Sequence, residues 1–422
     1  MERLKNTISF VDILIRLLFF LYLFSIIFGL SLPFQTKFSD QYKEMEETYT
    51  SGNLAAQMLY VVLFCASVFY LILKREMLIN FIKEDKFLSL LLLWIIITIF
   101  FSNYPFVSFK RVFQTITTVT ISLSFLFTRN SLKVLLNYLE ILFGLFLVLS
   151  FISVLVIPGA TDPGYHAWRG LANGKNLFGQ ICAINVFFWI YIISLKSSLF
   201  KTFLALNMTI LSIVLLIGSN SITAIITTMI CAMILMLKST GNLFKPLGIG
   251  NVYMITISIS ITALLAYVAI FELDEIARFL QLFGKNLSFT GRTDLWMDVL
   301  HNAKRHLLFG CGFNSFWIVG SRHLNYFWDR YSWFPIQAHN GYVDLLNETG
   351  IIGLVLLILL IINYYISIRN QKKYNIWAII FLIGLIINFQ ETSLLKARTF
   401  IWGMFCLSYL IQFIKNDMVK TE

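Results

Sequence analysis

The sequence predicts an all-α, polytopic membrane protein with one large helical loop outside the membrane. Two observations support this prediction. Of the 422 residues, 58% are hydrophobic and only 13% are charged, whereas soluble domains carry roughly 25% charged residues. Apolar runs long enough to cross about 30 Å of hydrocarbon also recur along the chain, and they predict about 12 transmembrane helices.

The first of these runs is too long for the core of a signal peptide, and no small-residue cleavage site follows it. We therefore expect it to remain in the protein as a helix. The seventh and eighth runs are separated only by the residues GSNS. The predicted spans are residues 11–32, 54–73, 87–102, 111–128, 135–157, 177–195, 200–217, 219–237, 251–271, 350–368, 374–390 and 397–415.

Basic residues predict the orientation of the helices, because Lys and Arg concentrate on cytoplasmic loops. With the N-terminus in the cytoplasm, most Lys and Arg residues of the short loops fall on the cytoplasmic side. Both termini are then cytoplasmic, and the segment 272–349 lies outside. We predict a single integral membrane domain over residues 1–422, with this segment as an extracytoplasmic loop within it. Because the basic residues lie at the ends of spans, the net charge of +11 does not indicate nucleic acid binding.

Part of the extracytoplasmic loop, residues 292–308, has the pattern of an amphipathic helix. Thr290 suits its N-cap, and Asp294 and Asp298 suit its early turns. We expect this helix to lie along the membrane surface as a lid. Its predicted apolar stripe consists of Leu295, Val299, Ala303 and Leu307.

The first candidate site is the stretch PGATDPGYHAWRGLANGKN, residues 158–176, directly before a predicted span. Its GLANGKN segment is slightly similar to a nucleotide-binding loop, but it misses the spacing by one residue and has Asn176 where the metal-binding hydroxyl belongs. A glycine-rich turn with Arg169 and Lys175 before a helix N-terminus suits a phosphate. The alternative is that both cations only reach lipid headgroups.

The second candidate is Arg292, at the predicted start of the amphipathic helix. Free backbone N–H groups and a guanidinium would both favour an anion there. The alternative is an ordinary solvated arginine, which is the commoner case for a surface position.

The third candidate is His339, in the stretch QAHNGYVDLLNETGIIGLVLL, where polar residues directly precede a membrane span. A histidine beside an apolar helix is often only structural. Here Asn340 follows it, and Asp344 and Glu348 lie close behind. If the helix begins early, Asp344 falls about one turn along on the same side. The imidazole could then act as a general base near neutral pH.

Other chemistries find no support in the sequence, and we expect neither a metal nor a cofactor. The five histidines form no H-E-x-x-H motif, and the five cysteines form no C-x-x-C pair. A serine hydrolase is not indicated either, since G-x-S-x-G does not occur.

Four segments follow one another over about residues 165 to 357: WRGLANGKNLFGQ, GSNSITA, FTGRTDLWMDVLHNAKRHLLFGCGFNSFW and HNGYVDLLNETGIIG. In order and spacing they resemble the O-antigen polymerase and ligase superfamily. The resemblance is strongest to the exopolysaccharide-polymerase (Wzy-type) branch, with the O-antigen ligases (WaaL-type) as relatives. The family pattern of His, then Asn, Ser or Gln, nine residues and Gly is met by His339, Asn340 and Gly350.

The resemblance implies a GT-C-like fold and a metal-independent glycosyltransferase in the bacterial cytoplasmic (inner) membrane, with its active site on the extracytoplasmic face. Its donor would be a glycan on undecaprenyl diphosphate. Arg292 and His339 correspond to the functional arginine and histidine of the family, and Asp344 and Glu348 would support them. The residues expected to bind the diphosphate or the substrate are Arg169, Lys175, Asn176 and Asn340.

The expected function is the polymerisation of lipid-linked repeat units into O-antigen or exopolysaccharide. The expected partners are membrane lipids and a glycan acceptor, either a lipid-linked repeat unit or lipid A–core, together with a flippase and a chain-length regulator. A ligase that transfers the glycan to lipid A–core or protein is the first alternative. Ligases tend to have an additional arginine where this chain has Ile222, which favours the polymerase. The second alternative is a transporter of the lipid-linked sugar, which should show repeats, broken helices or charges buried within spans.

Overall fold

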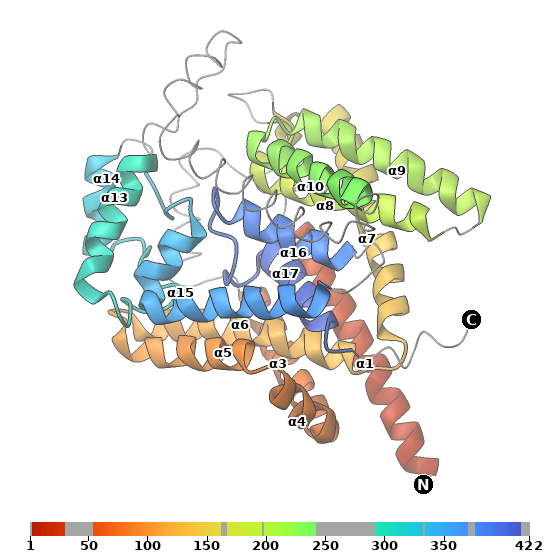
Figure 1. Ribbon diagram of the computed structural model, residues 1–422, viewed down its shortest axis with the longest axis horizontal. Helices are drawn as coiled ribbons and strands as arrows, with labels where there is room; N and C mark the ends of the chain where they lie inside the picture. The colour runs from red at the N-terminus through yellow and green to blue at the C-terminus, as the bar shows by residue number, and fades with distance from the viewer. Residues whose placement is uncertain are drawn as a thin grey trace.

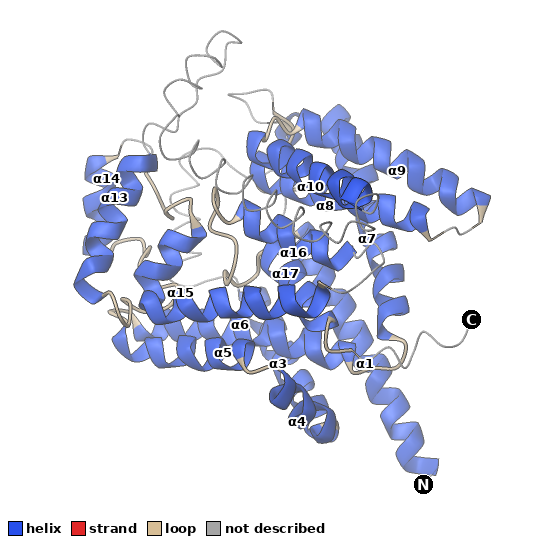
Figure 2. Ribbon diagram, viewed as in Figure 1, coloured by secondary structure: helices blue, strands red, loops and turns tan. Residues whose placement is uncertain are grey.

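The computed structural model describes residues 2–29, 54–161, 167–195, 198–241, 292–331, 334–369 and 376–414. Within these ranges the regular elements are helices, joined by loops and turns (Figure 2), and the only extended pairing among them is a single bridge between Thr161 and Trp168. The all-α class is therefore confirmed.

Each predicted span that falls on described residues corresponds to a helix, and the span 251–271 lies outside them. Among the described residues, six helices are long and apolar enough to cross a membrane: α1 (Glu2–Phe28), α3 (Leu54–Leu73), α7 (Ser131–Val156), α8 (Lys175–Ser194), α9 (Leu199–Gly218) and α15 (Gly341–Ile368). The remaining helices of the bundle are α4 (Arg75–Glu84), α5 (Phe87–Ile97) with η1 (Thr98–Phe101), α6 (Pro105–Leu126), η2 (Pro158–Ala160), α10 (Ile222–Gly241), α16 (Ile376–Ile387) and α17 (Phe400–Ile411).

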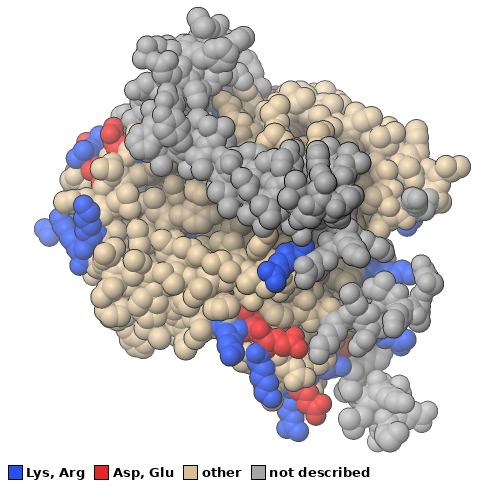
Figure 3. Space-filling model, viewed as in Figure 1, with Lys and Arg blue, Asp and Glu red and all other residues tan. Residues whose placement is uncertain are grey.

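The helices pack into one bundle, in which α15 lies along α5, α3 along α6 and α8 along α9 (Figure 1). A large apolar core runs through it, with ring contacts such as the stack of Phe19 on Phe125 at 3.9 Å between centroids. On the face shown in Figure 3, charged side chains form small groups at the left and in the lower half, and broad uncharged areas lie between them. These features confirm a polytopic membrane protein.

The described part of the loop that was predicted to lie outside the membrane forms α13 (Arg292–Ala303), η4 (Lys304–His306) and α14 (Arg322–Arg330), which lie together at the left of Figure 1. Leu295, Val299 and Ala303 are buried, as predicted. The prediction for Leu307 was wrong, since this side chain is 44% exposed. The α-helix gives way to a 3₁₀ turn before Leu307, and the tighter turn moves later residues off the stripe. The predicted cap, Thr290, lies outside the described residues.

The apolar stripe of α13 faces a small core built by this loop itself. Leu295 and Val299 pack in one cluster with Trp317, Leu324 and Phe327. Trp296 Nε1 also donates to Ala338 O at 2.7 Å, which ties α13 to the segment just before α15. The role of α13 as a lid stays a prediction.

Helix α15 begins at Gly341, earlier than the predicted residue 350, and it is kinked at Gly350 (φ 68°, ψ −174°). At the kink the chain of residues 307–312 packs backbone to backbone against it. Ile351 N donates to Leu307 O at 2.8 Å, and Gly312 N donates to Glu348 O at 3.0 Å. A Cβ at Gly350 would lie 2.2 Å from Leu308 O, so the approach requires glycine.

Helices α16 and α17 have 12 residues each, about 18 Å, and neither alone spans 30 Å of hydrocarbon. The chain between them, residues 388–399, is irregular and is buried at residues 391–395. Its backbone groups are satisfied by protein, since Asn388 Oδ1 accepts hydrogen bonds from Ser393 N at 3.1 Å and Leu394 N at 2.9 Å. Irregular backbone at membrane depth is tolerated where protein surrounds it in this way.

Candidate functional site

Glu391, in the irregular segment between α16 and α17, is the centre of the polar cluster around His339. Its Oε2 lies 3.1 Å from His339 Nδ1 and accepts a hydrogen bond from Gln337 Nε2 at 3.0 Å. Its Oε1 accepts one from Asn176 Nδ2 at 2.8 Å. Three segments distant in the sequence therefore meet on one buried carboxylate.

Arg292 reaches the same place from the first residue of α13. Its Nη1 donates to Gln390 O at 3.3 Å, and its charge acts on the neighbouring Glu391 carboxylate. Gln390 is itself fixed, because Thr223 Oγ1 donates to its Oε1 at 2.5 Å. The structure thus brings the predicted Arg292, His339 and Asn176 together at the segment 390–391.

The electrostatics of the cluster favour an ionised carboxylate. Burial by itself would raise the pKa of Glu391. The hydrogen bond and charge of His339 lower it, with help from Arg292 and Asn176, and the net pKa lies below the usual value of a glutamate. Burial lowers the pKa of Arg292, and Glu391 opposes that effect. A guanidinium remains charged under all ordinary conditions.

The contact with Glu391 also selects a tautomer of His339. Gln337 Nε2 lies 3.3 Å from His339 Nδ1, but the same amide nitrogen donates to Glu391 at 3.0 Å. An ionised carboxylate can only accept hydrogen bonds, so we assign the proton to Nδ1, which donates to Glu391. Whenever the ring is neutral, its lone pair is then on Nε2, the arrangement that serves a general base.

The local sequence explains the position of His339. Asn340 is the N-cap of α15, and its Oδ1 accepts hydrogen bonds from Tyr342 N at 3.1 Å and Val343 N at 3.2 Å. His339 has φ 52°, a left-handed conformation that is uncommon for residues with a Cβ. The side chain of Asn340, predicted to bind substrate, thus caps the helix that follows the histidine.

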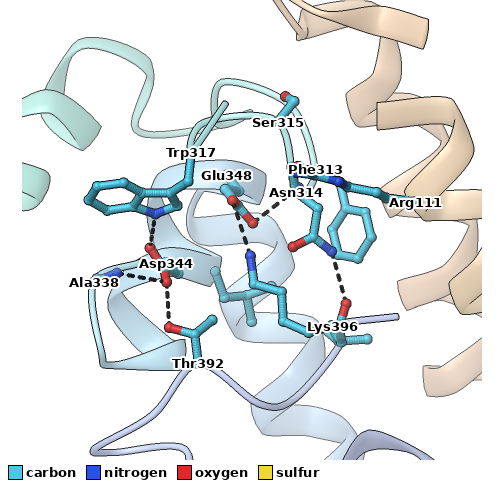
Figure 4. Close-up of polar contacts among 12 residues, drawn as sticks. Arg111, Phe313, Asn314, Ser315, Trp317, Ala338, Asp344, Glu348, Thr392 and Lys396 are labelled. Atoms are coloured by element: carbon cyan, nitrogen blue, oxygen red, sulfur yellow. Dashed lines mark hydrogen bonds and ion pairs between the residues drawn. The ribbon is translucent and has the colours of Figure 1, made fainter. Parts of the chain in front are cut away.

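Asp344 connects the segments that carry His339 and Glu391 through the neighbours of these two residues, Ala338 and Thr392 (Figure 4). Its Oδ2 accepts hydrogen bonds from Ala338 N at 3.1 Å and from Thr392 Oγ1 at 2.5 Å. These two residues directly precede His339 and directly follow Glu391. Its Oδ1 accepts a bond from Trp317 Nε1 at 2.7 Å. The carboxylate therefore holds both segments in register.

Glu348 lies one turn further along α15 and points to other partners (Figure 4). Its Oε2 accepts a hydrogen bond from Asn314 N at 3.0 Å, and its Oε1 lies 3.5 Å from Lys396 Nζ. Arg111 donates to the backbone oxygen of Asn314 in the same cluster. Glu348 thus joins the loop at Asn314 to the segment 388–399, and Arg111 of α6 contacts the same part of the loop.

The other predicted cations lie near the start of α8. Lys175 is the first residue of that helix and directly precedes Asn176. Arg169 Nε donates to Gly159 O at 2.5 Å, and its backbone N donates to Ala160 O at 2.9 Å. Through these bonds Arg169 fixes the conformation of its own loop against residues 159 and 160. In the described part of the chain, no group of three or more His, Cys, Asp or Glu side chains lies close enough to hold a metal ion.

Glu391 and Gln337 were not among the residues predicted from the sequence. Glu391 lies 52 residues after His339, between two apolar spans. One signal was present, because Glu391 is the only acidic residue between Glu348 and Asp417. An isolated carboxylate in such an apolar stretch is costly and is commonly functional.

Comparison with known proteins agrees with the motifs. Residues 208–358 match the family model described as O-antigen ligase. This range contains Arg292 and His339, whereas Asn176 and Glu391 lie outside it.

Two curated relatives are similar to larger parts of the chain. The exopolysaccharide production protein ExoQ of Rhizobium meliloti (strain 1021) is 26% identical over 212 residues, 48% of this chain and 48% of the relative. A Rickettsia felis protein, provisionally named as a polysaccharide ligase, is 26% identical over 255 residues, 58% of this chain and 60% of the relative. The chain thus spans about half the length of the curated relatives it matches. Together, the family match and these relatives support the assignment of the chain to the O-antigen ligase and polymerase superfamily, as the sequence motifs predicted.

Proposed function

We propose that the protein is a membrane glycosyltransferase that joins glycan repeat units carried on undecaprenyl diphosphate. The observation that carries this proposal is the meeting of Arg292, His339 and Glu391, from three separate segments, at one place in the fold. A cation for a leaving anion and a base for an incoming hydroxyl are the two groups that such a transfer requires.

In the proposed reaction a hydroxyl of the acceptor sugar attacks the anomeric carbon of the donor. His339 Nε2 takes the hydroxyl proton, and Glu391 stabilises the imidazolium through the proton on Nδ1. The bond between the anomeric carbon and the diphosphate oxygen breaks, and the lipid diphosphate leaves with the electron pair. Arg292 stabilises the negative charge that develops on the leaving group.

The start of α8 is suited to the rest of the diphosphate. Helix N-termini present free N–H groups to anions, and Lys175 adds a positive charge at the first residue of α8. We expect the transfer to proceed without a metal ion, so that EDTA leaves its rate unchanged. We further propose that the site faces the extracytoplasmic side of the cytoplasmic membrane, with both termini in the cytoplasm. A flippase would supply the donor, and a regulator would set the chain length.

The second candidate is a ligase that moves the same lipid-linked glycan to lipid A–core or to protein. It is favoured by the description of the matching family as O-antigen ligase. The Rickettsia felis relative carries a similar name. The chemistry at Arg292, His339 and Glu391 would be the same, and only the acceptor differs.

The decisive experiment incubates the purified full-length protein with undecaprenyl-diphosphate-linked repeat units and no other acceptor. The polymerase proposal predicts a ladder of longer lipid-linked glycans and the release of undecaprenyl diphosphate. Growth that begins only when lipid A–core is added would replace the polymerase with the ligase. Neither product, with protein that is folded, would contradict both.

A further inference from the structure

A second cluster of cations lies at the opposite end of α13 from Arg292. There a cavity of about 120 Å³ is enclosed by the end of α13, by α14 and by the residues that lead into α6. Helix α13 has 12 residues, which at 1.5 Å per residue separates this cavity from Arg292 by about 18 Å. It is therefore a different site from the His339–Glu391 cluster.

The lining of the cavity is suited to an anion. Arg305, His306 and His323 contribute to it, and its described lining contains neither Asp nor Glu. Burial lowers the pKa of His323, and the charges of His306, Arg305 and Arg322 lower it further. The positive groups thus repel one another across the cavity, and a bound anion would relieve that repulsion.

Several of these side chains are held in place by other residues. Asn302 Nδ2 donates to Asn347 Oδ1 at 3.1 Å, and His306 Nε2 lies 3.2 Å from the same oxygen. The ring of His323 stacks on Phe316, with 5.6 Å between centroids. Groups fixed in this way lose little freedom when a ligand arrives.

The two segments that form opposite walls of the cavity continue into exposed apolar residues. Phe101 precedes one wall and Phe309 follows the other, and their rings stack at 5.0 Å between centroids. Next to them Leu308 is 57% exposed and Phe106 is 68% exposed. An apolar rim therefore adjoins the cationic cavity, and Lys and Arg side chains also gather on the surface beside α13 and α14 (Figure 3).

We propose that this cavity binds the phosphate group of a membrane lipid. Arg305 and the two histidines take the phosphate, and the lipid chains lie on the rim formed by Phe101, Phe106, Leu308 and Phe309. A phosphate held by Arg in a partly buried cavity makes charge-assisted hydrogen bonds, and the rim removes the chains from water. This proposal does not depend on the proposed glycosyl transfer.

Three probes separate the contributions of phosphate and chains in native mass spectrometry of the full-length protein in detergent. Dioctanoyl phosphatidic acid has both parts, dioctanoylglycerol has only the chains, and inorganic phosphate has only the anion. We expect saturable binding of one phosphatidic acid at concentrations at which the other two do not bind. Equal binding of dioctanoylglycerol or of inorganic phosphate would overturn the proposal, since either would show that one part suffices.

Two variants test whether the lipid phosphate binds in this cavity. Arg305→Gln combined with His323→Gln should weaken phosphatidic acid binding by about tenfold or more, as expected for lost bonds between charged groups. Lys304→Gln removes a neighbouring charge that does not line the cavity, and it should stay within about twofold of the wild type. Unchanged binding in the double variant, or equal weakening in both variants, would overturn the proposed location. The comparison of the three probes on wild-type protein remains decisive if the double variant does not fold.

Discussion

At the scale of single residues, His339 combines three constraints. Its backbone has φ 52°, its Nδ1 faces Glu391 at 3.1 Å, and its neighbour Ala338 is held by Asp344. A non-glycine residue in this conformation costs of order 1–3 kcal/mol and persists where surrounding contacts determine it. The contacts around His339 thus hold its ring in position although the backbone conformation of the residue is unfavourable. Such strained backbone conformations are common at functional sites.

Arg292→Ala should lower glycan transfer by roughly 10²–10³-fold, the range found when a fixed charge-stabilising group is removed. Arg292→Lys should recover little, because an ammonium lacks the planar fork of the guanidinium. Both predictions are checked by measuring the turnover of each purified variant. Arg330→Ala is the matched control, because Arg330 lies in the same loop and pairs with Asp298 at the surface. Normal turnover of Arg292→Ala would make Arg292 a structural residue.

The lowered pKa of Glu391 predicts a dependence of stability on pH. A carboxyl whose folded pKa lies below its unfolded value stabilises the fold above that unfolded value, about 4.3 for glutamate. This stability is lost as the pH falls through the folded pKa. The unfolding temperature of the wild type should therefore fall on acidification below about pH 4.3. It should fall less steeply in Glu391→Gln. Parallel curves for the two proteins would show that the carboxylate contributes nothing to this loss.

The sequence predicted some residues of the site and missed others, for physical reasons. His339 and Arg292 follow local patterns, a polar pair before a span and an arginine at a helix start. Glu391 contacts them only through tertiary structure, because its segment folds back between α16 and α17. Asn176 was predicted to bind substrate, and its contact with Glu391 could not be read from its neighbours.

At the scale of helices, the kink of α15 lies at Gly350, the residue at which the sequence predicted that this helix begins. The apolar pattern begins at Gly350, whereas the helix begins at Gly341 with Asn340 as its cap. The nine residues between are helical but polar, because they carry Asp344 and Glu348 into the protein. The kink thus separates a part of α15 that organises the site from a part that has the composition of a membrane span.

Gly350→Ala should destabilise the protein by about 1–3 kcal/mol, since alanine is strained at this backbone conformation. The added Cβ would also lie 2.2 Å from Leu308 O. The loss should appear as a lower unfolding temperature in detergent. Gly144→Ala is the control, because its Cβ would meet only Trp189 at 3.8 Å. A helix-interior glycine changed to alanine in open space should be neutral or stabilising. Equal unfolding temperatures for both variants would contradict this account of the kink.

The break between α16 and α17 was predicted as a short connection between the spans 374–390 and 397–415, but its burial inside the bundle was not predicted. An apolar pattern does not show how a connection between two spans folds. Contacts hold the irregular segment inside the bundle, among them Asn314 Nδ2 to Leu395 O at 3.0 Å and Gly341 N to Asn388 O at 2.8 Å. Broken helices also occur in transporters. Here the break places Glu391 beside His339, which suits a reaction site.

At the scale of the whole molecule, hydropathy predicted the helical bundle well because each span is a local property of the chain. Figure 1 places α13 and α14 at one end of the bundle, away from the described ends of the chain. Arg16 is a charged residue within the first predicted span, residues 11–32. It donates through Nη2 to Arg129 O in the turn after α6, and this contact explains its place.

The orientation predicted from basic residues can be tested with reporters. A reporter fused after residue 320 should be active outside the cytoplasm, and one fused after residue 370 should be active inside it. Alkaline phosphatase and a fluorescent protein provide the two complementary signals. Cytoplasmic fluorescence from the fusion at residue 320 would contradict the proposed side of the site.

The most direct test of the central claim is the turnover of His339→Ala in the purified system. The substrate is undecaprenyl-diphosphate-linked repeat units, with lipid A–core added if the wild type requires it. We predict a loss of at least about 10²-fold relative to the wild type, as expected for a positioned acid–base group. The variant should keep the same amount of folded protein in the membrane, and single repeat units should remain on their lipid. Wild-type turnover in His339→Ala would contradict the claim that His339 is the base of a glycosyl transfer.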